Sequence, residues 1–176
     1  MDRKPIHLYV KEIQSPIGSL VLVASNKGLC SIEFGTLADN QAKLERWVNR
    51  WFGSHQLKAD GEALQAVHEQ LEQYFGGERQ CFELELDLQG TIFQKQVWEA
   101  LKLIPYGETA SYKAVAEAIG SPKAVRAVGG ANNRNPIPVI IPCHRVIGAS
   151  GKQVGYGGGL PIQTHLLQLE GKDGSR

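Results

Sequence analysis

Short apolar runs separated by turn sequences dominate the first third of the chain. The runs at residues 8–13, 20–24 and 29–34 are rich in Val, Ile and Leu, and the stretches between them, 15–18 and 26–28, carry Pro, Asn and Gly. Runs of this kind between such turns are typical of antiparallel strands joined by hairpins. The pattern therefore predicts a β-meander.

Two stretches with helical spacing follow the meander. Apolar residues recur every three or four positions over residues 41–52 and again over 64–75, where Gly76-Gly77 ends the pattern. Residues 82–87 (FELELD) alternate strictly between apolar and acidic side chains, which predicts a half-exposed strand. We expect the aromatic residues of this half to lie in the core.

The pattern changes at Gln89-Gly90, which predicts two domains, 1–89 and 90–176. Thr91 and Gln94 form a capping box at the start of the next helix. The apolar face expected for this helix consists of Ile92, Phe93, Val97, Trp98, Leu101 and Ile104.

Further helix signals follow in the second half. Ser111 is placed to cap a short helix, 112–119, that ends at Gly120. Ser121-Pro122 then predicts an N-cap and first turn for a helix that runs to about Ala131. Two short helices joined by a tight turn containing Gly are the helix-turn-helix pattern. Pro161 opens a last helix.

The second helix of that pair is unusually poor in bulky side chains. Each Gly lowers helix stability by about 1 kcal/mol relative to Ala, so small residues here suggest close approach to another surface. One interpretation is a helix pressed into a nucleic-acid groove with the guanidinium of Arg126 inserted. The alternative is tight helix–helix packing with Arg126 on the solvent side. The small residues are Ala124, Ala127, Gly129 and Gly130.

The net charge of +1 hides an asymmetry between the halves. Residues 1–89 hold nine Lys or Arg against thirteen Asp or Glu, and residues 90–176 hold ten against five, so the net charges are −4 and +5. A basic second half favours a polyanionic partner, although a chance imbalance on solvated faces would look the same.

Cysteine usage and hydropathy indicate the compartment. Three widely spaced cysteines without a CxxC pair indicate a reducing environment, and no apolar stretch is long enough for a membrane span or a secretory signal, so we expect a cytoplasmic protein. We expect Cys30 and Cys81 in the core. The possible metal ligands of the first half, which form no closed set of standard spacing, are His7, Cys30, His55, His68 and Cys81, so no metal is expected.

Residues 138–146 (PVIIPCHRV) are the strongest candidate for chemistry. The apolar run resembles a buried strand, but Pro138 and Pro142 remove two amide donors, so the backbone entering Cys143 must be irregular. A thiol beside the imidazole of His144 suits nucleophilic catalysis. A small buried hydrophobe is an equally good interpretation of Cys143 taken alone.

The neighbouring residues favour the chemical interpretation, because they resemble a known family. Residues 142–146, preceded by 135–138 (NPIP) and 126–131 (RAVGGA), are similar to the O6-alkylguanine-DNA alkyltransferases, also called methylated-DNA–protein-cysteine methyltransferases. The similarity runs from Gly90 to Gly171 and is looser in the amino-terminal half.

The resemblance implies an α/β amino-terminal domain with a ribonuclease-H-like sheet, followed by a mostly helical, winged-helix-like domain with a DNA-binding helix-turn-helix. It implies DNA repair by direct damage reversal. An alkyl group, typically methyl, would move from O6 of guanine, or O4 of thymine, in double-stranded DNA to Cys143. Each molecule would act once, as a monomer without a cofactor, because a thioether is not readily hydrolysed.

The resemblance also implies roles around the thiol. Cys143 needs a base, and because neighbouring side chains on an extended backbone point to opposite faces, a water would bridge it to His144. Glu170 would orient the imidazole, Tyr112 would help guanine leave, and Asn135 would tie the recognition helix to the active-site loop. Taken alone, these three would be a helix-end carboxylate, a core tyrosine and an Asn-Pro turn.

A base inside a duplex must be flipped out before a side chain can reach it. The resemblance implies that Arg126 fills the vacated stack. The expected DNA-binding residues are Ser111, Tyr112, Ala124, Arg126, Ala127, Gly129 and Gly130. The expected walls of the base pocket are Pro138, Val146, Tyr156, Gly157 and Gly158.

One position departs from the family pattern. Several relatives carry serine where this chain has Gly157, so we expect a more mobile loop and acceptance of bulkier alkyl groups. Two other functions are compatible with parts of the pattern. A thiol hydrolase would use the same Cys143 and His144, and a DNA-damage-binding module would use the same helix-turn-helix but would lack the cysteine.

Overall fold

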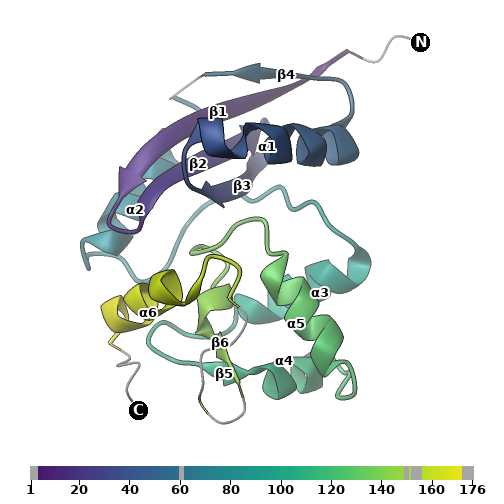
Figure 1. The fold of residues 1–176 in the computed structure, drawn as a ribbon, viewed down its shortest axis with the longest axis vertical. Coiled ribbons are helices and arrows are strands. Elements are labelled where there is room, and N and C mark those ends of the chain that lie inside the picture. Colours follow the sequence, from purple (N-terminus) through teal and green to yellow (C-terminus); the bar gives the residue numbers. More distant parts are fainter. Residues whose placement is uncertain (1–3, 60–61, 149–150, 152–155, 172–176) are drawn as a thin grey trace. The chain divides into compact units, whose positions relative to one another are not determined.

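The computed structural model describes residues 4–59, 62–148, 151 and 156–171 (Figure 1). The chain divides into two compact units, Met1–Gln89 and Gly90–Arg176. Residues 152–155 of the loop before Tyr156 lie outside the described residues.

The first unit is built on a four-stranded sheet in the order β3-β2-β1-β4. The predicted meander is confirmed, because β1 pairs antiparallel with β2, and β2 with β3. The fourth strand, which pairs parallel with β1, was not predicted. The strands are β1 (Ile6–Ser15), β2 (Gly18–Ser25), β3 (Gly28–Phe34) and β4 (His55–Lys58).

The strand predicted at residues 82–87 is wrong. The segment forms only an isolated bridge, between Leu86 and Leu29, although its burial does alternate over 82–85. Alternation of apolar and acidic residues predicts which side chains are covered. A strand also needs a neighbouring strand that forms hydrogen bonds with it along its length. Cys81, expected in the core, is exposed just before this segment, whereas Cys30 is buried in β3 as predicted.

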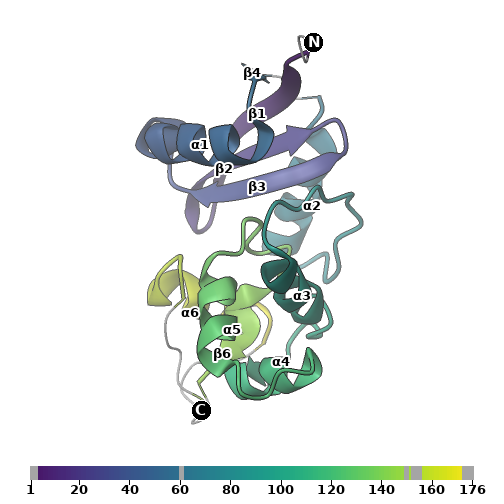
Figure 2. The ribbon, with the colours of Figure 1, turned by 90° about the vertical axis from the view of Figure 1, so that its right-hand side faces the viewer.

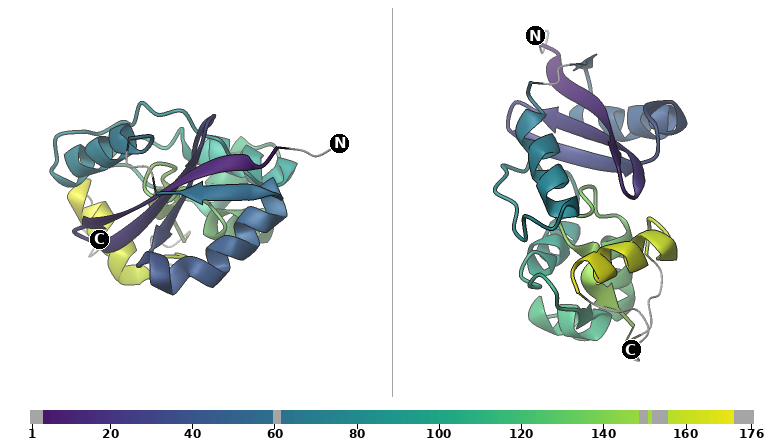
Figure 3. Two further views of the ribbon diagram at one scale, coloured as in Figure 1. Left: turned by 90° about the horizontal axis from the view of Figure 1, so that it is seen from above. Right: turned by 90° about the vertical axis from the view of Figure 1, so that its left-hand side faces the viewer.

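Helices α1 (Leu37–Phe52) and α2 (Gln65–Phe75) lie on opposite faces of the sheet (Figure 3). Residues 20–23 of β2 are fully buried, because both of its faces are covered. Helix α1 begins four residues before the predicted start, because Thr36 caps it by accepting from the Asp39 amide at 3.1 Å.

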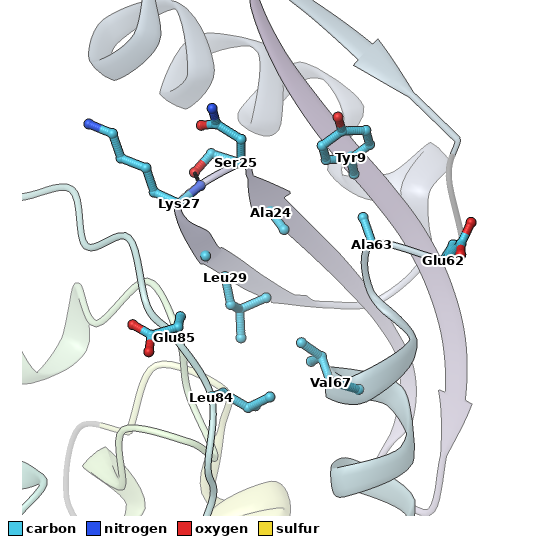
Figure 4. Close-up of a pocket in the computed structure, with 13 residues that line it drawn as sticks. Tyr9, Ala24, Ser25, Lys27, Leu29, Glu62, Ala63, Val67, Leu84 and Glu85 are labelled. Atoms are coloured by element: carbon cyan, nitrogen blue, oxygen red, sulfur yellow. Dashed lines mark hydrogen bonds between the residues drawn. The ribbon is translucent and has the colours of Figure 1, made fainter.

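A pocket of about 540 Å³ opens in the first unit (Figure 4). Leu29, Val67 and Leu84 line its apolar part, and Lys27 and Glu62 lie at its polar edge. None of the residues predicted for the active site lines this pocket.

The second unit is mostly helical (Figure 2), and its described residues include one short parallel ribbon. Helices α3, α4 and α5 pack on one another, and α6 packs against the 3-10 helix η1. The ribbon pairs β5 with β6. The elements are α3 (Ile92–Leu101), β5 (Ala110–Ser111), α4 (Tyr112–Ala118), α5 (Val125–Asn133), η1 (Cys143–Arg145), β6 (Val146–Ile147) and α6 (Leu160–Leu169).

The capping signals of this unit are confirmed for α3 and α4. Thr91 and Gln94 form the reciprocal capping box, and the Ser111 hydroxyl accepts from the Ala114 amide at 2.9 Å. Trp98 is buried as predicted. Ile92, which was also expected on the apolar face, is the first residue of α3 and is 82% exposed.

The start predicted for α5 at Ser121-Pro122 is wrong. Ser121 begins a turn instead, in which the Ala124 amide donates to the Ser121 carbonyl at 2.9 Å, and the helix starts at Val125 without a side-chain cap. The buried residues of α5 are Val128, Ala131 and Asn132. No helix of the described residues is both long and apolar enough to cross a membrane.

Candidate functional site

The candidate thiol lies at the end of a strained turn. Val139 has a φ of 74°, a conformation that β-branched residues rarely adopt. The Ile141 amide donates to the Ile137 carbonyl at 3.0 Å, and the Cys143 amide donates to the Ile141 carbonyl at 2.8 Å. The run is therefore a compact turn that delivers Cys143 into η1.

The extended backbone expected at Cys143-His144 is wrong, because residues 143–145 form the 3-10 helix η1. All three side chains of η1 are buried. The short helix still sends Cys143 and His144 in different directions, since successive residues of a 3-10 helix lie about a third of a turn apart.

Glu170 binds two side chains of η1, those of His144 and Arg145. Its Oε2 accepts from His144 Nε2 at 2.8 Å and from Arg145 Nη2 at 3.0 Å, and its Oε1 accepts from Arg145 Nε at 2.8 Å. Arg145 also donates to the Ile104 carbonyl at 2.7 Å. The predicted His144–Glu170 pair is therefore present, and Arg145 completes a buried ionic cluster.

This cluster fixes the state of the imidazole. Burial lowers the pKa of His144, and the hydrogen bond that the ring donates to Glu170 opposes that shift. A neutral ring that donates from Nε2 must carry its acceptor on Nδ1. Nδ1 is buried and has no hydrogen-bond partner among the described residues, so it is the atom that can take a proton.

Cys143 is 4% exposed, and its environment holds the proton on the thiol. Burial raises the pKa of Cys143 to about 11, and hydrogen bonds from the Asn135 and Tyr156 side chains partly oppose the rise. The sequence named Asn135 as a tie between the recognition helix and the loop, and Tyr156 as a wall of the base pocket, but neither as a neighbour of the thiol. Two donors at a buried sulfur favour the thiolate once a base removes the proton.

Asn135 spans the turn that precedes Cys143 through its side chain. Its Nδ2 donates to the Ile141 carbonyl at 2.8 Å, and its Oδ1 accepts from the Ile137 amide at 3.0 Å. Asn132, which sequence reasoning missed, is buried at the end of α5, and its Nδ2 lies 3.4 Å from the Cys143 carbonyl.

The β5–β6 ribbon brings Tyr112 toward the thiol. Ala110 pairs with Val146, directly after η1, and Ser111 pairs with Ile147. Burial raises the pKa of Tyr112, and the nearby Cys143 raises it further. A methyl group added at Gly129 would lie 3.9 Å from the Tyr112 ring, so Tyr112 also lies beside α5.

The outer face of α5 is exposed and smooth. Arg126, Ala127 and Gly130 are exposed, and a methyl group added at Gly130 would meet nothing within 4 Å. Tight helix–helix packing therefore does not explain Ala127 and Gly130, whereas Gly129 does face Tyr112. Ala124 precedes the helix and is half-buried.

The residues predicted to wall the base pocket differ in their burial. Val146, Pro138 and Tyr156 are buried, while Gly157 is exposed and Gly158 half-buried. A methyl group at Gly157 would lie 3.2 Å from the Asn133 carbonyl, so a larger residue there requires a small shift at the end of α5. Across the described ranges, no three His, Cys, Asp or Glu side chains gather into a possible metal site.

Both halves of the chain match one family. Residues 8–88 match the 6-O-methylguanine DNA methyltransferase, ribonuclease-like domain, and residues 92–172 match the 6-O-methylguanine DNA methyltransferase, DNA binding domain. The chain belongs to the 6-O-methylguanine DNA methyltransferase family.

Curated relatives and solved structures agree with this family assignment. A methylated-DNA–protein-cysteine methyltransferase of Methanosarcina acetivorans is 46% identical over 93% of this chain and 99% of the relative. A methylated-DNA–protein-cysteine methyltransferase of Mycobacterium leprae is 47% identical over 93% of this chain and 92% of the relative. The structure of the Mycobacterium tuberculosis O6-methylguanine methyltransferase is 44% identical and covers 93% of this chain and 92% of its own, with a TM-score of 0.78.

A structure of the Mycobacterium tuberculosis protein in complex with DNA is similar to the same extent, with a TM-score of 0.77, 44% identity and coverage of 93% and 92%. The family therefore joins a sheet domain to a helical DNA-binding domain, as this chain does. Neither a thiol hydrolase nor a non-catalytic damage binder is favoured by these relatives.

Proposed function

We propose that this protein repairs DNA by moving an alkyl group, typically methyl, from O6 of guanine to its own Cys143. The observation that carries the proposal is the placement of Cys143 in η1, beside a His144 whose ring is held by Glu170 at 2.8 Å. O4-alkylthymine is a second substrate of the same chemistry. No cofactor takes part.

The reaction forms one bond and breaks one. The Cys143 proton passes to His144 Nδ1 through a bridging water, and the thiolate attacks the alkyl carbon. As the S–C bond forms, the C–O6 bond breaks and its electron pair returns to the guanine ring, which takes a proton from the Tyr112 hydroxyl. The proton held on His144 then restores the tyrosine through solvent, so the thiol's proton ends on guanine. The products are guanine and S-alkylcysteine, so each molecule acts once.

Double-stranded DNA containing the alkylated base is the proposed partner, bound along the exposed face of α5. The smooth surface at Ala127 and Gly130 permits close approach to a groove, and Arg126 fills the stack after the base flips out. The half-buried Ser111, Tyr112, Ala124 and Gly129 are proposed as further DNA contacts at the edge of this face. Asn135 is proposed to keep α5 in register with the thiol.

The proposed base pocket is walled by Pro138, Val146, Tyr156, Gly157 and Gly158. Gly157 lacks the hydroxyl found in several relatives, so we propose that the pocket admits alkyl groups bulkier than methyl.

The proposal also covers the fold type of each unit, the cellular compartment and the oligomeric state. The meander with a parallel fourth strand supports a ribonuclease-H-like sheet, and three packed helices beside a short ribbon support a winged-helix-like unit. The free cysteines support a reducing cytoplasm. The protein acts as a monomer.

Intact-mass measurement tests the function. After incubation with an O6-methylguanine duplex, the protein should gain one methyl group on Cys143, with a yield that stops at one per molecule, and Cys143→Ser should gain none. A tag on Cys30 or Cys81, or continued turnover, would refute the mechanism. The same assay with O6-benzylguanine tests the pocket, since a protein that accepts only methyl contradicts the role of Gly157.

A further inference from the structure

Helix α6 holds the active-site turn at two points. Glu170, just after its last residue, accepts from the His144 ring. Gln163, seven residues earlier and therefore on nearly the same face, is completely buried. Its Nε2 donates to the main-chain carbonyls of His144 at 3.0 Å and Val146 at 3.2 Å. His144 is thus held by its ring and by its backbone from one helix.

The chemistry of the Gln163 contacts fixes the orientation of the amide. Both partners are carbonyl oxygens, which accept only, so the amide nitrogen must face them. Gln163 Oε1 is then left buried, and it has no hydrogen-bond partner within the described part of the chain. A methionine of similar length would spare this unpaired oxygen, but it would leave the His144 and Val146 carbonyls without the donor that Gln163 supplies. The glutamine is therefore matched to these two carbonyls.

The carbonyls of His144 and Val146 belong to the segment of backbone that positions both the His144 ring and Tyr112. The His144 carbonyl belongs to the base itself. Val146 begins β6 and pairs with Ala110, which leads through Ser111 into the helix that carries Tyr112. A displacement of the chain at residues 144–146 would therefore move His144 and Tyr112 relative to Cys143.

We propose that Gln163 is a positioning residue for alkyl transfer, an inference that rests on the function proposed above. By holding the carbonyls of His144 and Val146, it keeps His144 Nδ1 in line with the thiol of Cys143. Gln163 touches neither the thiol nor the base. Its effect reaches the chemistry through His144.

The test compares Gln163→Met with Gln168→Met, an exposed glutamine on the same helix. Single-turnover alkylation of Cys143 is followed over a range of O6-methylguanine duplex concentrations. The amplitude reports the folded fraction, and the rate constant reports the site in folded molecules. We expect Gln163→Met to lower the saturating rate constant about tenfold or more, because small misplacements of catalytic groups have effects of up to about 100-fold. The half-saturating DNA concentration should not change.

The pH dependence separates positioning from a structural defect. The deficit of Gln163→Met should shrink as the pH rises, because hydroxide then forms the thiolate without the base. Gln168→Met should match the wild type throughout. A rate constant within twofold of the wild type, a loss confined to the amplitude, or a deficit independent of pH would overturn the proposal. Failure of the wild type to alkylate Cys143 would instead refute the proposed function.

Discussion

Among single residues, Glu170 shows how the site is balanced. Both of its carboxylate oxygens are used, one by Arg145 Nε and the other by Arg145 Nη2 and His144. Glu170 and Arg145 are 5% and 7% exposed. Because the guanidinium neutralises the carboxylate, Glu170 can orient His144 without drawing its proton away. Arg145 is therefore part of the arrangement that keeps the imidazole neutral.

We expect Glu170→Gln to lower the free energy of unfolding by roughly 3–5 kcal/mol, because it leaves the buried Arg145 charge uncompensated. Urea denaturation followed by circular dichroism measures the change. The matched control is Glu99→Gln, which breaks an exposed pair with Lys102 and should alter stability by less than about 1 kcal/mol. Equal effects of the two substitutions would contradict a buried ionic cluster.

Among the secondary-structure elements, α5 joins the DNA face to the thiol. Its inner side is tied to the core by the Trp98 indole, which donates to the Ala131 carbonyl at 2.8 Å, and by Asn132 beside the Cys143 carbonyl. Its outer side carries Ala127 and Gly130 with no covering residue near Gly130. A helix anchored on one side and smooth on the other suits an interface that must come close to a groove.

Gly130→Ala separates helix stability from DNA binding. The added methyl group meets nothing within 4 Å, and alanine stabilises a helix interior by about 0.5–1 kcal/mol relative to glycine, so thermal unfolding should occur at a higher temperature. The same methyl group should weaken binding to duplex DNA severalfold, as measured by fluorescence anisotropy. Higher stability with unchanged affinity would show that this face of α5 does not contact DNA.

Across the molecule, each unit buries one thiol whose proton is held tightly. Burial raises the pKa of Cys30 in the first unit to about 11, and burial does the same for Cys143 in the second. Cys30 lies near Asp87, which accepts from the Ser25 hydroxyl at 2.6 Å and adds to the rise. The stability of both units should therefore depend on pH in the alkaline range in the same way.

The sign of this dependence follows from linkage. A thiol whose pKa is higher in the folded state than the ordinary value of 9.0 gives stability below pH 9 that is lost as the pH rises toward 11. We therefore expect the free energy of unfolding to fall by about 1–2 kcal/mol per thiol over this range. Cys30→Ala should remove its share of the slope in urea denaturation under reducing conditions. An unchanged slope in that variant would contradict the burial of a protonated Cys30.

The sequence by itself determined what local chemistry controls. Thr91 and Gln94 cap α3, Ser111 caps α4, and the alternation of apolar runs and turns predicted the meander, because caps and turns involve residues only a few positions apart. The motif around Cys143 and the family resemblance likewise predicted the His144–Glu170 contact. These features depend on side-chain type and spacing, which the sequence states directly.

Tertiary structure decided the features that need a distant partner. Residues 82–87 alternate like a strand but find one bridge, β4 is a strand only because β1 lies beside it, and Cys81 is exposed although most cysteines are not. Gln163 and Asn132 carry no local signal, because their acceptors lie 11 to 19 residues away in the chain. Burial and hydrogen-bond partners arise only when separate segments pack together, and that packing makes an ordinary glutamine part of a proposed active site.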